Sequence, residues 1–280
     1  MTPVLRYAAF ADTPDGGNPA GIVLDAAGLA DEEMQRIAAD IGYAETAFVV
    51  EAAVGGDARR SRLRYFSPIA EVPFCGHATV ATAVALSERD GVGAFDFDTP
   101  VGAVSITTRT VDTAVSASFT SVEPRVRDLD DAVLDALLAL LGSTRADLHP
   151  DYPPRLAYAG NWHPVVVFAE RETFDTFGFD PAALRSLMDA QGWAGTVTTL
   201  RVAGAGEFEA RNLFPVGVIT EDPATGSAAA SVGGYLRSLG AAPGRVVIHQ
   251  GAHVGRPGLL TVDIPAEGGI VVSGTAVPIA

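Results

Sequence analysis

The sequence predicts an α+β fold of two pseudo-symmetric modules, each a curved mixed β-sheet wrapped round one central helix. Short segments rich in β-branched and aromatic residues outnumber the helical segments along the chain. A pair of motifs occurs twice at similar spacing, which indicates an internal repeat. Two segments consist of small residues without a charged face, as expected of helices that are buried on all sides.

The first half of the chain is expected to hold one amphipathic helix among several strands. Met34, Ile37, Ala38 and Ile41 recur at helical spacing, which predicts a helix from 31 to 41 that Asp31 caps. The expected strands are Val4–Phe10, Gly21–Leu24, Thr46–Val50, Leu63–Phe66, Ala94–Phe97, Ala103–Thr107 and Ala114–Phe119.

The second half repeats this mixture of elements. A leucine-rich helix is expected from Asp130 to Leu141, after a linker at Pro124–Asp128. No alternation of strands and helices accompanies a glycine fingerprint, which argues against a dinucleotide-binding sheet. The expected strands are Pro164–Phe168, Thr196–Val202, Ala210–Phe214, Arg245–Ile248, Leu259–Ile264 and Gly269–Ser273.

The internal repeat consists of two pairs of similar segments. Gly17–Leu24 resembles Gly160–Val167, and downstream of them Cys75–Ala85 resembles Thr225–Tyr235. The similar spacing favours two copies of one module, and chance matching of small residues is the alternative.

The repeat places the expected domain boundary near the middle of the chain. The N-terminal module is expected to cover residues 1–120, and the C-terminal module residues 121–267. The last strand, about 268–280, is a candidate to return to the first module. Each module then contains one copy of the central helix.

The charged residues exclude several classes of function. All 19 Lys+Arg residues among the 280 are arginine, so no lysine can form a Schiff base or complete a phosphate-binding loop. With 34 Asp+Glu the formal charge is −15, which should repel nucleic acid and anionic membrane surfaces. An anionic ligand must therefore be held by local features of the chain.

The sequence predicts neither a metal site nor a targeting segment. The single cysteine, Cys75, cannot form an internal disulfide, so a cytoplasmic location is expected. The start of the chain does not resemble a signal peptide, and no apolar stretch approaches the length of a membrane span. His249 and His253 are four residues apart, but Gly251 and Gly255 argue against a metal-binding helix there.

Each central helix is expected to begin with a glycine followed by a polar residue, at Gly76-His77 and Gly226-Ser227. The first turn of a helix offers unpaired N–H groups and a partial positive charge, and glycine allows a ligand to approach the backbone. If the modules face each other, two helix starts can hold one small anion. The alternative is that these are ordinary capping residues.

Several motifs resemble the PhzF family of phenazine-biosynthesis-like isomerases, which have a diaminopimelate epimerase-like fold. The most specific is the string Glu221-Asp-Pro-Ala-Thr-Gly-Ser-Ala228. Similar order and spacing run over nearly the whole chain. The other matching segments are Gly17-Asn-Pro19, Glu45-Thr-Ala-Phe48, Tyr65-Phe-Ser-Pro68, Phe74-Cys-Gly-His-Ala-Thr79, Gln250-Gly251 and Gly255-Arg-Pro257.

The resemblance implies an active site between the modules in which Glu45 carries the proton. His77 would orient the substrate or relay a proton, and Asp222 would bind or polarise its amino or hydroxyl group. Ser227 would donate a hydrogen bond to a substrate carboxylate together with the Gly226 N–H. The resemblance also suggests a homodimer.

The residues themselves leave alternatives open. Apolar neighbours would desolvate Glu45 and raise its pKa, although Glu45 could also stand exposed at a strand start. Asp222 could be a turn residue before Pro223. Asn18 could line the cleft or make a turn, as could its repeat counterpart Asn161, and Arg211 with Asn212 is a weaker pair of candidates that could hold a second acidic group.

The cysteine position separates two hypotheses about the reaction. In the epimerase relatives a cysteine heads each central helix, whereas here Cys75 heads the first and Thr225 the second. A two-thiol racemisation is therefore excluded, and Cys75 is either a small buried apolar residue or a partner of Glu45 or Asp222 in a racemase or epimerase.

The function expected is a cofactor-independent and metal-independent isomerase that moves a proton between carbons of a small carboxylate substrate. The first alternative is the Cys75-assisted racemase or epimerase. The second is a non-catalytic protein of the same fold that binds small molecules. The substrate itself is not readable from the sequence.

Overall fold

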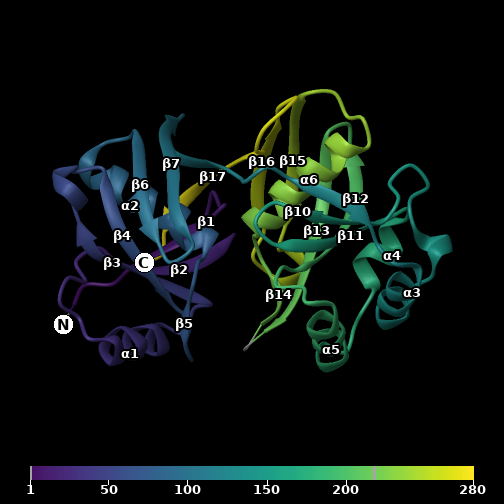
Figure 1. The fold of residues 1–280 in the computed structure, drawn as a ribbon, viewed down its shortest axis with the longest axis horizontal. Coiled ribbons are helices and arrows are strands. Elements are labelled where there is room, and N and C mark those ends of the chain that lie inside the picture. Colours follow the sequence, from purple (N-terminus) through teal and green to yellow (C-terminus); the bar gives the residue numbers. More distant parts are fainter. Residues whose placement is uncertain (1, 217–218) are drawn as a thin grey trace. The chain divides into compact units, whose positions relative to one another are not determined.

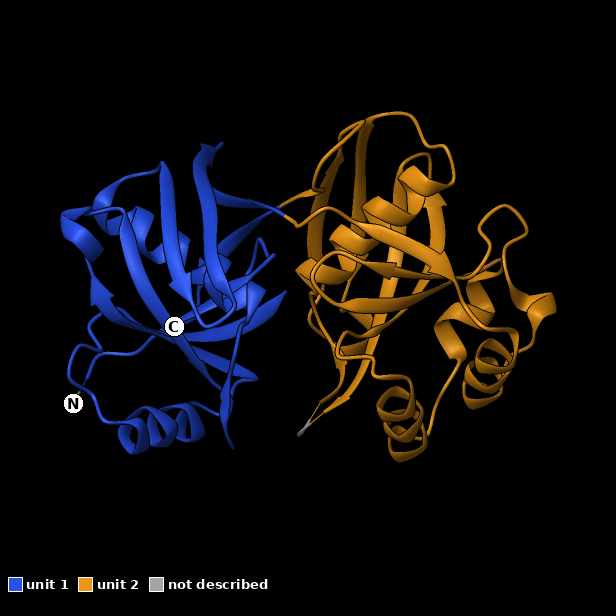
Figure 2. Cartoon of the chain, viewed as in Figure 1, with its two compact units in different colours: residues 1–120, 273–280 blue, residues 121–272 orange. Residues whose placement is uncertain are grey.

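The computed structural model describes residues 2–216 and 219–280. The chain forms two compact units: unit 1 comprises residues 1–120 and 273–280, and unit 2 residues 121–272 (Figure 2). The helices are α1 (Asp31–Ile41), α2 (Gly76–Asp90), α3 (Asp131–Leu140), α4 (Arg171–Thr176), α5 (Pro181–Gln191) and α6 (Gly226–Ser238) (Figure 1).

Strands make up most of unit 1 and close on themselves. They are β1 (Leu5–Ala9), β2 (Asn18–Val23), β3 (Glu45–Ala52), β4 (Arg60–Phe66), β5 (Glu71–Val72), β6 (Ala94–Thr99), β7 (Gly102–Val111), β8 (Ala114–Thr120) and β17 (Val271–Pro278). Pairing runs from β1 through β2, β3, β4, β6, β7 and β8 to β17, which pairs with β1 again. The β2–β3 and β4–β6 pairs are parallel, so this is a mixed, barrel-like sheet.

Unit 2 is also a mixed sheet with helices against it. Its strands are β9 (Arg125–Asp128), β10 (Arg155–Tyr158), β11 (Trp162–Phe168), β12 (Val197–Gly204), β13 (Glu207–Val216), β14 (Ile219–Asp222), β15 (Gly244–Gln250) and β16 (Gly258–Ile264). Pairing runs from β9 through β10, β11, β12, β13 and β15 to β16, with β11–β12 and β13–β15 parallel.

One helix in each unit is buried along most of its length. Every residue of α2 from His77 to Ser87 is buried, and α2 packs against β1, β2, β3, β7 and β8. Helix α6 is buried from Ala228 to Leu236 and packs against β9, β10, β11 and β16. The small side chains predicted from the sequence allow this, because bulky residues would hold the strands away from the helix.

The helices outside the sheets complete the apolar core. In unit 1, α1 covers Phe48 and Phe66 through Met34 and Ile37. In unit 2, α3, α4 and α5 contribute to one apolar cluster with β11 and Trp193. Within the described residues, no helix has the length and apolar character to cross a membrane.

Two predictions about local structure are wrong. Ala30, not Asp31, is the N-cap of α1, and the Asp31 carboxylate instead pairs with Arg64 at 2.6 Å. The expected linker at 124–128 is strand β9, because Arg125 to Asp128 pair with β10. Exposed Arg125 and Arg127 flank the partly buried Val126, which is the alternation expected of a strand with one face exposed to solvent.

Helix α5 was not predicted from the sequence, although the residues at its N-terminus are typical of a helix start. The Asp180 carboxylate accepts hydrogen bonds from the N–H groups of Ala182 and Ala183, and Pro181 occupies the first helical position. An aspartate cap followed by proline is a strong helix start.

Candidate active site

In unit 1 the start of β3 and the start of α2 bring together Glu45, Cys75 and His77. The Cys75 Sγ lies 3.4 Å from the Glu45 Oε2 and 3.3 Å from the His77 Nδ1. The His77 Nε2 lies 3.6 Å from the same Glu45 oxygen. Cys75 is therefore not an isolated apolar residue, because its thiol is in contact with both polar side chains.

Hydrogen bonds at the start of α2 hold Cys75 and His77 in position. Cys75 is the N-cap of α2 in an extended conformation, and its carbonyl oxygen accepts a 2.7 Å hydrogen bond from the Thr79 hydroxyl. Thr79 in turn is 2.7 Å from the buried Tyr65 hydroxyl. Glu45 is set by parallel pairing, in which it lies opposite Ala20 of β2.

The His77 imidazole is held neutral at neutral pH. Its side chain is almost completely buried, and burial lowers the pKa of His77 to about 4, although a hydrogen bond with the Pro19 backbone partly opposes that shift. A neutral imidazole can donate through one nitrogen and accept through the other.

We expect acid to destabilise the fold between pH 6.5 and pH 5. Burial lowers the pKa values of both His77 and His163 to about 4, below the ordinary value of 6.5. The unfolded chain takes up protons at these positions below pH 6.5 while the folded chain does not, so the free energy of unfolding falls as the pH falls. Urea unfolding at pH 7, 6 and 5 measures this effect.

A histidine variant provides the control for this prediction. His163→Asn should reduce the dependence of stability on pH, because it removes one of the two buried imidazoles. A stability that is constant from pH 7 to pH 5 would contradict the neutral, buried state of both imidazoles.

Gly76 lies between Cys75 and His77 in the chain, and Asn18 belongs to the strand that pairs with β3. Asn18 begins β2, is buried, and pairs with Ala9 of β1. Gly76 is the first residue of α2. Gly17 has a φ of 50°, and a side chain there would lie 2.1 Å from the Ala9 carbonyl oxygen, so the turn into β2 requires glycine.

In unit 2, Asp222 lies at the end of β14, just before α6. The Thr225 hydroxyl donates a 2.5 Å hydrogen bond to the Asp222 Oδ2. The Gln250 amide donates to the Asp222 carbonyl oxygen at 2.6 Å, and its Oε1 accepts from the Thr225 N–H at 3.2 Å. Gln250 belongs to one of the sequence motifs but was not predicted as a site residue, and the structure gives it this bracing role.

Ser227 has a partner that the sequence did not reveal. Its Oγ lies 3.2 Å from the Nε2 of His163, which is fully buried in β11. Asn161, the counterpart of Asn18, directly precedes β11. The only sequence signal for His163 was its position in the repeated segment, where unit 1 has Ala20.

Both buried helices begin without a side-chain cap. Neither Cys75 at the start of α2 nor Thr225 at the start of α6 accepts a hydrogen bond from the first turn through its side chain. The first-turn N–H groups and the helix dipole of α2 and α6 can therefore act on an anion. Acidic side chains are absent from both first turns.

Arg211 does not hold a second acidic group. Its guanidinium pairs with Glu221, donates to the carbonyl oxygens of Phe174 and Phe177, and stacks on the Phe177 ring at 3.7 Å. These partners leave it buried and committed to the core, so the sequence-based suggestion is wrong for Arg211. Asn212 is likewise occupied, since its Oδ1 accepts from Thr196 and Thr198.

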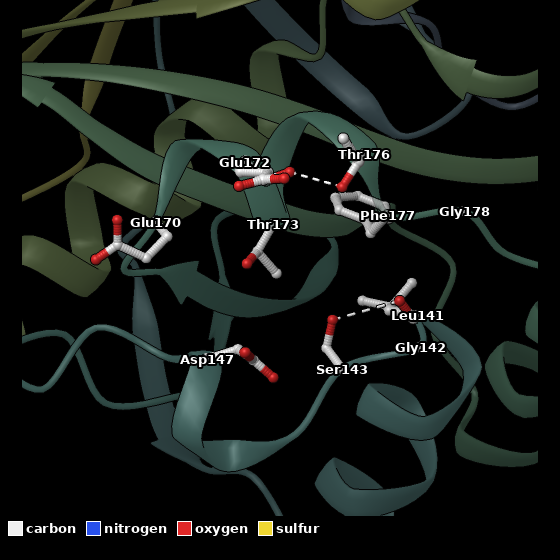
Figure 3. A pocket seen from close by; sticks show the side chains of 10 residues that line it. All are labelled: Leu141, Gly142, Ser143, Asp147, Glu170, Glu172, Thr173, Thr176, Phe177 and Gly178. Atoms are coloured by element: carbon white, nitrogen blue, oxygen red, sulfur yellow. Dashed lines mark hydrogen bonds between the residues drawn. The ribbon is translucent and has the colours of Figure 1, made fainter.

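Two open cavities in unit 2 do not contain the predicted residues. One, of about 640 Å³, lies beside α4 and is lined by Ser143, Asp147, Glu170 and Glu172 (Figure 3). Its hydroxyl groups are bonded to nearby backbone. The other, of about 690 Å³, contains Arg171 and Arg201, both already paired with Glu209.

The described residues contain one group with the donor atoms of a metal site. The ligand atoms of Glu45, Cys75 and His77 all lie within 4.8 Å of one another. The same proximity suits direct proton exchange among a carboxylate, a thiol and an imidazole. The structure therefore brings Glu45 and His77 together in unit 1, and Asp222, Gly226 and Ser227 together in unit 2.

The mixed sheets around buried helices are the architecture of an epimerase-like fold, and curated relatives of the chain are named isomerases. The family model described as phenazine biosynthesis-like protein matches residues 7–280. The chain belongs to this family. The sequence-based identification of the family is confirmed.

Curated relatives carry isomerase names. An uncharacterized isomerase of Bacillus subtilis is 30% identical over 286 residues, covering 98% of this chain and 95% of the relative. The trans-2,3-dihydro-3-hydroxyanthranilate isomerase of Pseudomonas fluorescens is 31% identical over 257 residues, covering 90% of this chain and 86% of the relative.

Solved structures agree with the fold. The phenazine biosynthesis protein of the PhzF family from Bacillus anthracis has a TM-score of 0.84 at 28% identity, covering 99% of this chain and 96% of that one. A hydroxyproline epimerase from Agrobacterium vitis has a TM-score of 0.62 at 12% identity, covering 99% and 90%, and shows a shared fold alone.

Proposed function

We propose that the protein moves a proton between carbons of a small carboxylate substrate without a cofactor, with Glu45 as the acid and base. The observation that carries this proposal is the position of the Glu45 carboxylate, 3.6 Å from the neutral His77 imidazole and beside the start of α2. A carboxylate is a strong enough base for a carbon acid when the developing negative charge is stabilised by fixed donors.

His77 serves this reaction as a neutral hydrogen-bonding group. Because burial lowers its pKa to about 4, the His77 imidazole stays uncharged at neutral pH. It can orient the Glu45 carboxylate or the substrate by hydrogen bonding. Asn18 and Gly76 are proposed to contact the substrate.

Unit 2 offers groups that suit a small carboxylate ligand. The first-turn N–H groups at Gly226 and Ser227 suit a carboxylate, as those at Gly76 do in unit 1, so no lysine is needed. Asp222, which is braced by Thr225 and Gln250, receives an amino or hydroxyl group of the substrate.

The two units are proposed to be copies of one module. Their strands pair in the same sequence of antiparallel and parallel contacts: β1 to β7 in unit 1 follow the same pattern as β10 to β16 in unit 2. Their buried helices, α2 and α6, both begin at a glycine. Duplication explains why each unit offers one helix start for an anion.

Isotope exchange tests the proposed reaction. The Pseudomonas fluorescens relative is named for trans-2,3-dihydro-3-hydroxyanthranilate, so this acid and other small amino and hydroxy acids are incubated with the protein in deuterated water. We expect one of them to be isomerised with deuterium at carbon, as read by mass spectrometry and NMR. An acid that binds tightly yet is neither isomerised nor labelled would indicate the non-catalytic alternative.

A second candidate function is a Cys75-assisted epimerase. It is favoured by the contact between the Cys75 Sγ and the Glu45 Oε2 at 3.4 Å, which would allow a proton to pass between the two groups. We expect the turnover of Cys75→Ala to stay within about tenfold of that of the unaltered protein, because Glu45 alone carries the proton. A loss of 10²-fold or more, on the scale of general acid–base catalysis, would favour the thiol.

A further inference from the structure

The start of α6 contains a hydrogen bond that determines which way the Ser227 hydroxyl points. The Ser227 Oγ lies 3.2 Å from the Nε2 of His163. His163 comes from β11 and has no exposed surface. In unit 1 the corresponding helix position is His77, whose imidazole is near a carboxylate rather than a hydroxyl.

The tautomer of His163 follows from its other nitrogen. The Nδ1 lies 3.0 Å from the Thr196 carbonyl oxygen. A carbonyl oxygen can only accept, so the Nδ1 must carry the proton. The neutral ring then has an unprotonated Nε2, and the Ser227 hydroxyl must donate to it. Neutrality is supported by burial, which lowers the pKa of His163 to about 4.

Buried neighbours hold the ring in this state. The Thr196 hydroxyl lies 3.1 Å from the Nδ1 and donates its own proton to the Asn212 Oδ1 at 2.7 Å. Thr198 donates to the same oxygen at 2.7 Å. With both hydroxyl protons directed at Asn212, the Thr196 oxygen is an acceptor for the Nδ1 proton.

The imidazole also packs closely against the backbone at Gly195. A side chain at Gly195 would place its Cβ 2.6 Å from the His163 Cε1 and 2.7 Å from the Trp162 carbonyl oxygen. Glycine at this position is therefore required for the close approach of the ring. The network from Asn212 through Thr196 and His163 ends at Ser227, which is only partly buried.

We propose that His163 is a positioning residue whose Nε2 accepts the hydrogen bond of the Ser227 hydroxyl, so that the Ser227 oxygen presents its lone pairs to the ligand. The ligand group beside Ser227 is then a hydrogen-bond donor, an amino or hydroxyl group, and its carboxylate is held by backbone N–H groups alone. This replaces the sequence-based expectation that the Ser227 hydroxyl donates to the carboxylate. The ligand class rests on the proposed function, whereas the direction of the hydrogen bond does not.

The test uses the full-length protein labelled with ¹⁵N at histidine. Long-range ¹H–¹⁵N spectra at pH 7 report which ring nitrogen carries the proton, and the signals of His163 are assigned from their loss in His163→Gln. We expect a protonated Nδ1 and an unprotonated Nε2 at His163. A protonated Nε2 would overturn the proposal without any further variant.

Ser227→Ala then isolates the hydrogen bond. We expect the His163 Nε2 signal to shift toward that of a nitrogen with no donor, while the Nδ1 signal stays in place. Ser238→Ala is the matched control, because Ser238 lies at the far end of α6 and bonds to the Tyr235 carbonyl oxygen. An Nε2 signal that is the same in Ser227→Ala and in the unaltered protein would refute the inference.

Turnover separates this inference from the proposed function. If an acid is isomerised, His163→Gln should lower turnover in the unaltered background and have little further effect in Ser227→Ala, because His163 acts through Ser227. Equal losses in both backgrounds would assign His163 a merely structural role. If no acid is isomerised but the spectra are as expected, the proposed function fails and the assignment of the hydroxyl proton stands.

Discussion

The Glu45→Gln variant is expected to fold and to bind the substrate but to lose isotope exchange by 10²-fold to 10⁴-fold, the contribution of a positioned acid or base. Glutamine preserves the size of the side chain and its contacts with Cys75 and His77 but cannot take up a proton. Deuterium incorporation measured by mass spectrometry gives the rate, and the ligand-induced rise in melting temperature reports binding.

Glu51→Gln is the matched control for this experiment. Glu51 lies on the same strand, β3, but near its far end, where it forms an ion pair with Arg62 at 2.6 Å. Both side chains are about half exposed, so the change should leave exchange and stability close to those of the unaltered protein. Exchange that survives in Glu45→Gln would show that the base lies elsewhere.

Gly251→Ala is expected to lower the stability of the fold strongly. Gly251 has a φ of 84°, and a Cβ there would lie 2.3 Å from the Arg256 carbonyl oxygen and 2.5 Å from that of Pro223. Positive φ and collisions with rigid backbone together should lower the free energy of unfolding by roughly 3 kcal/mol. Urea unfolding measures the loss.

The same substitution should also weaken ligand binding. Pro223 follows Asp222 directly, so a side chain at Gly251 would displace the segment that leads into α6.

Gly255→Ala is the control for both effects: the φ of Gly255 is 72°, but a Cβ there would meet no atom within 4 Å. We expect it to cost about 1 kcal/mol, the effect of positive φ alone. Equal losses of unfolding free energy in Gly251→Ala and Gly255→Ala would show that the contact with Pro223 is unimportant.

The sequence predicted elements that depend on local pattern. The helix from 31 to 41 has the bounds expected from its apolar spacing. The helix expected at 130–141 spans Asp131–Leu140, with Asp130 as its N-cap. In both cases, a periodic apolar face is enough to define the helix, because each buries that face in an apolar cluster.

The errors arose where distant residues decide the outcome. Asp31 does not cap α1 because Arg64, far along the chain, pairs with its carboxylate. Residues Arg125 to Asp128 form a strand because β10 offers a free edge. Neither partner can be identified from a local window of the sequence.

The candidate residues divide in the same way. Glu45, His77, Asp222 and Ser227 were chosen from motifs, which specify residue types and order. The sequence left open whether Cys75 is a partner of Glu45 or of Asp222, and its contact with Glu45 depends on how β3 and α2 pack. The role of His163 was not predicted, because it depends on how β11 packs against α6.

The sequence by itself determined the family, its epimerase-like fold with mixed sheets, and the absence of lysine chemistry, since these follow from motif order, strand patterning and composition. Only the tertiary structure decided the state of the polar groups. Burial is what keeps His77 and His163 neutral, and a carbonyl oxygen from Thr196 is what sets the His163 tautomer. Charge and proton position depend on the surroundings of a side chain, which exist only after the chain has folded.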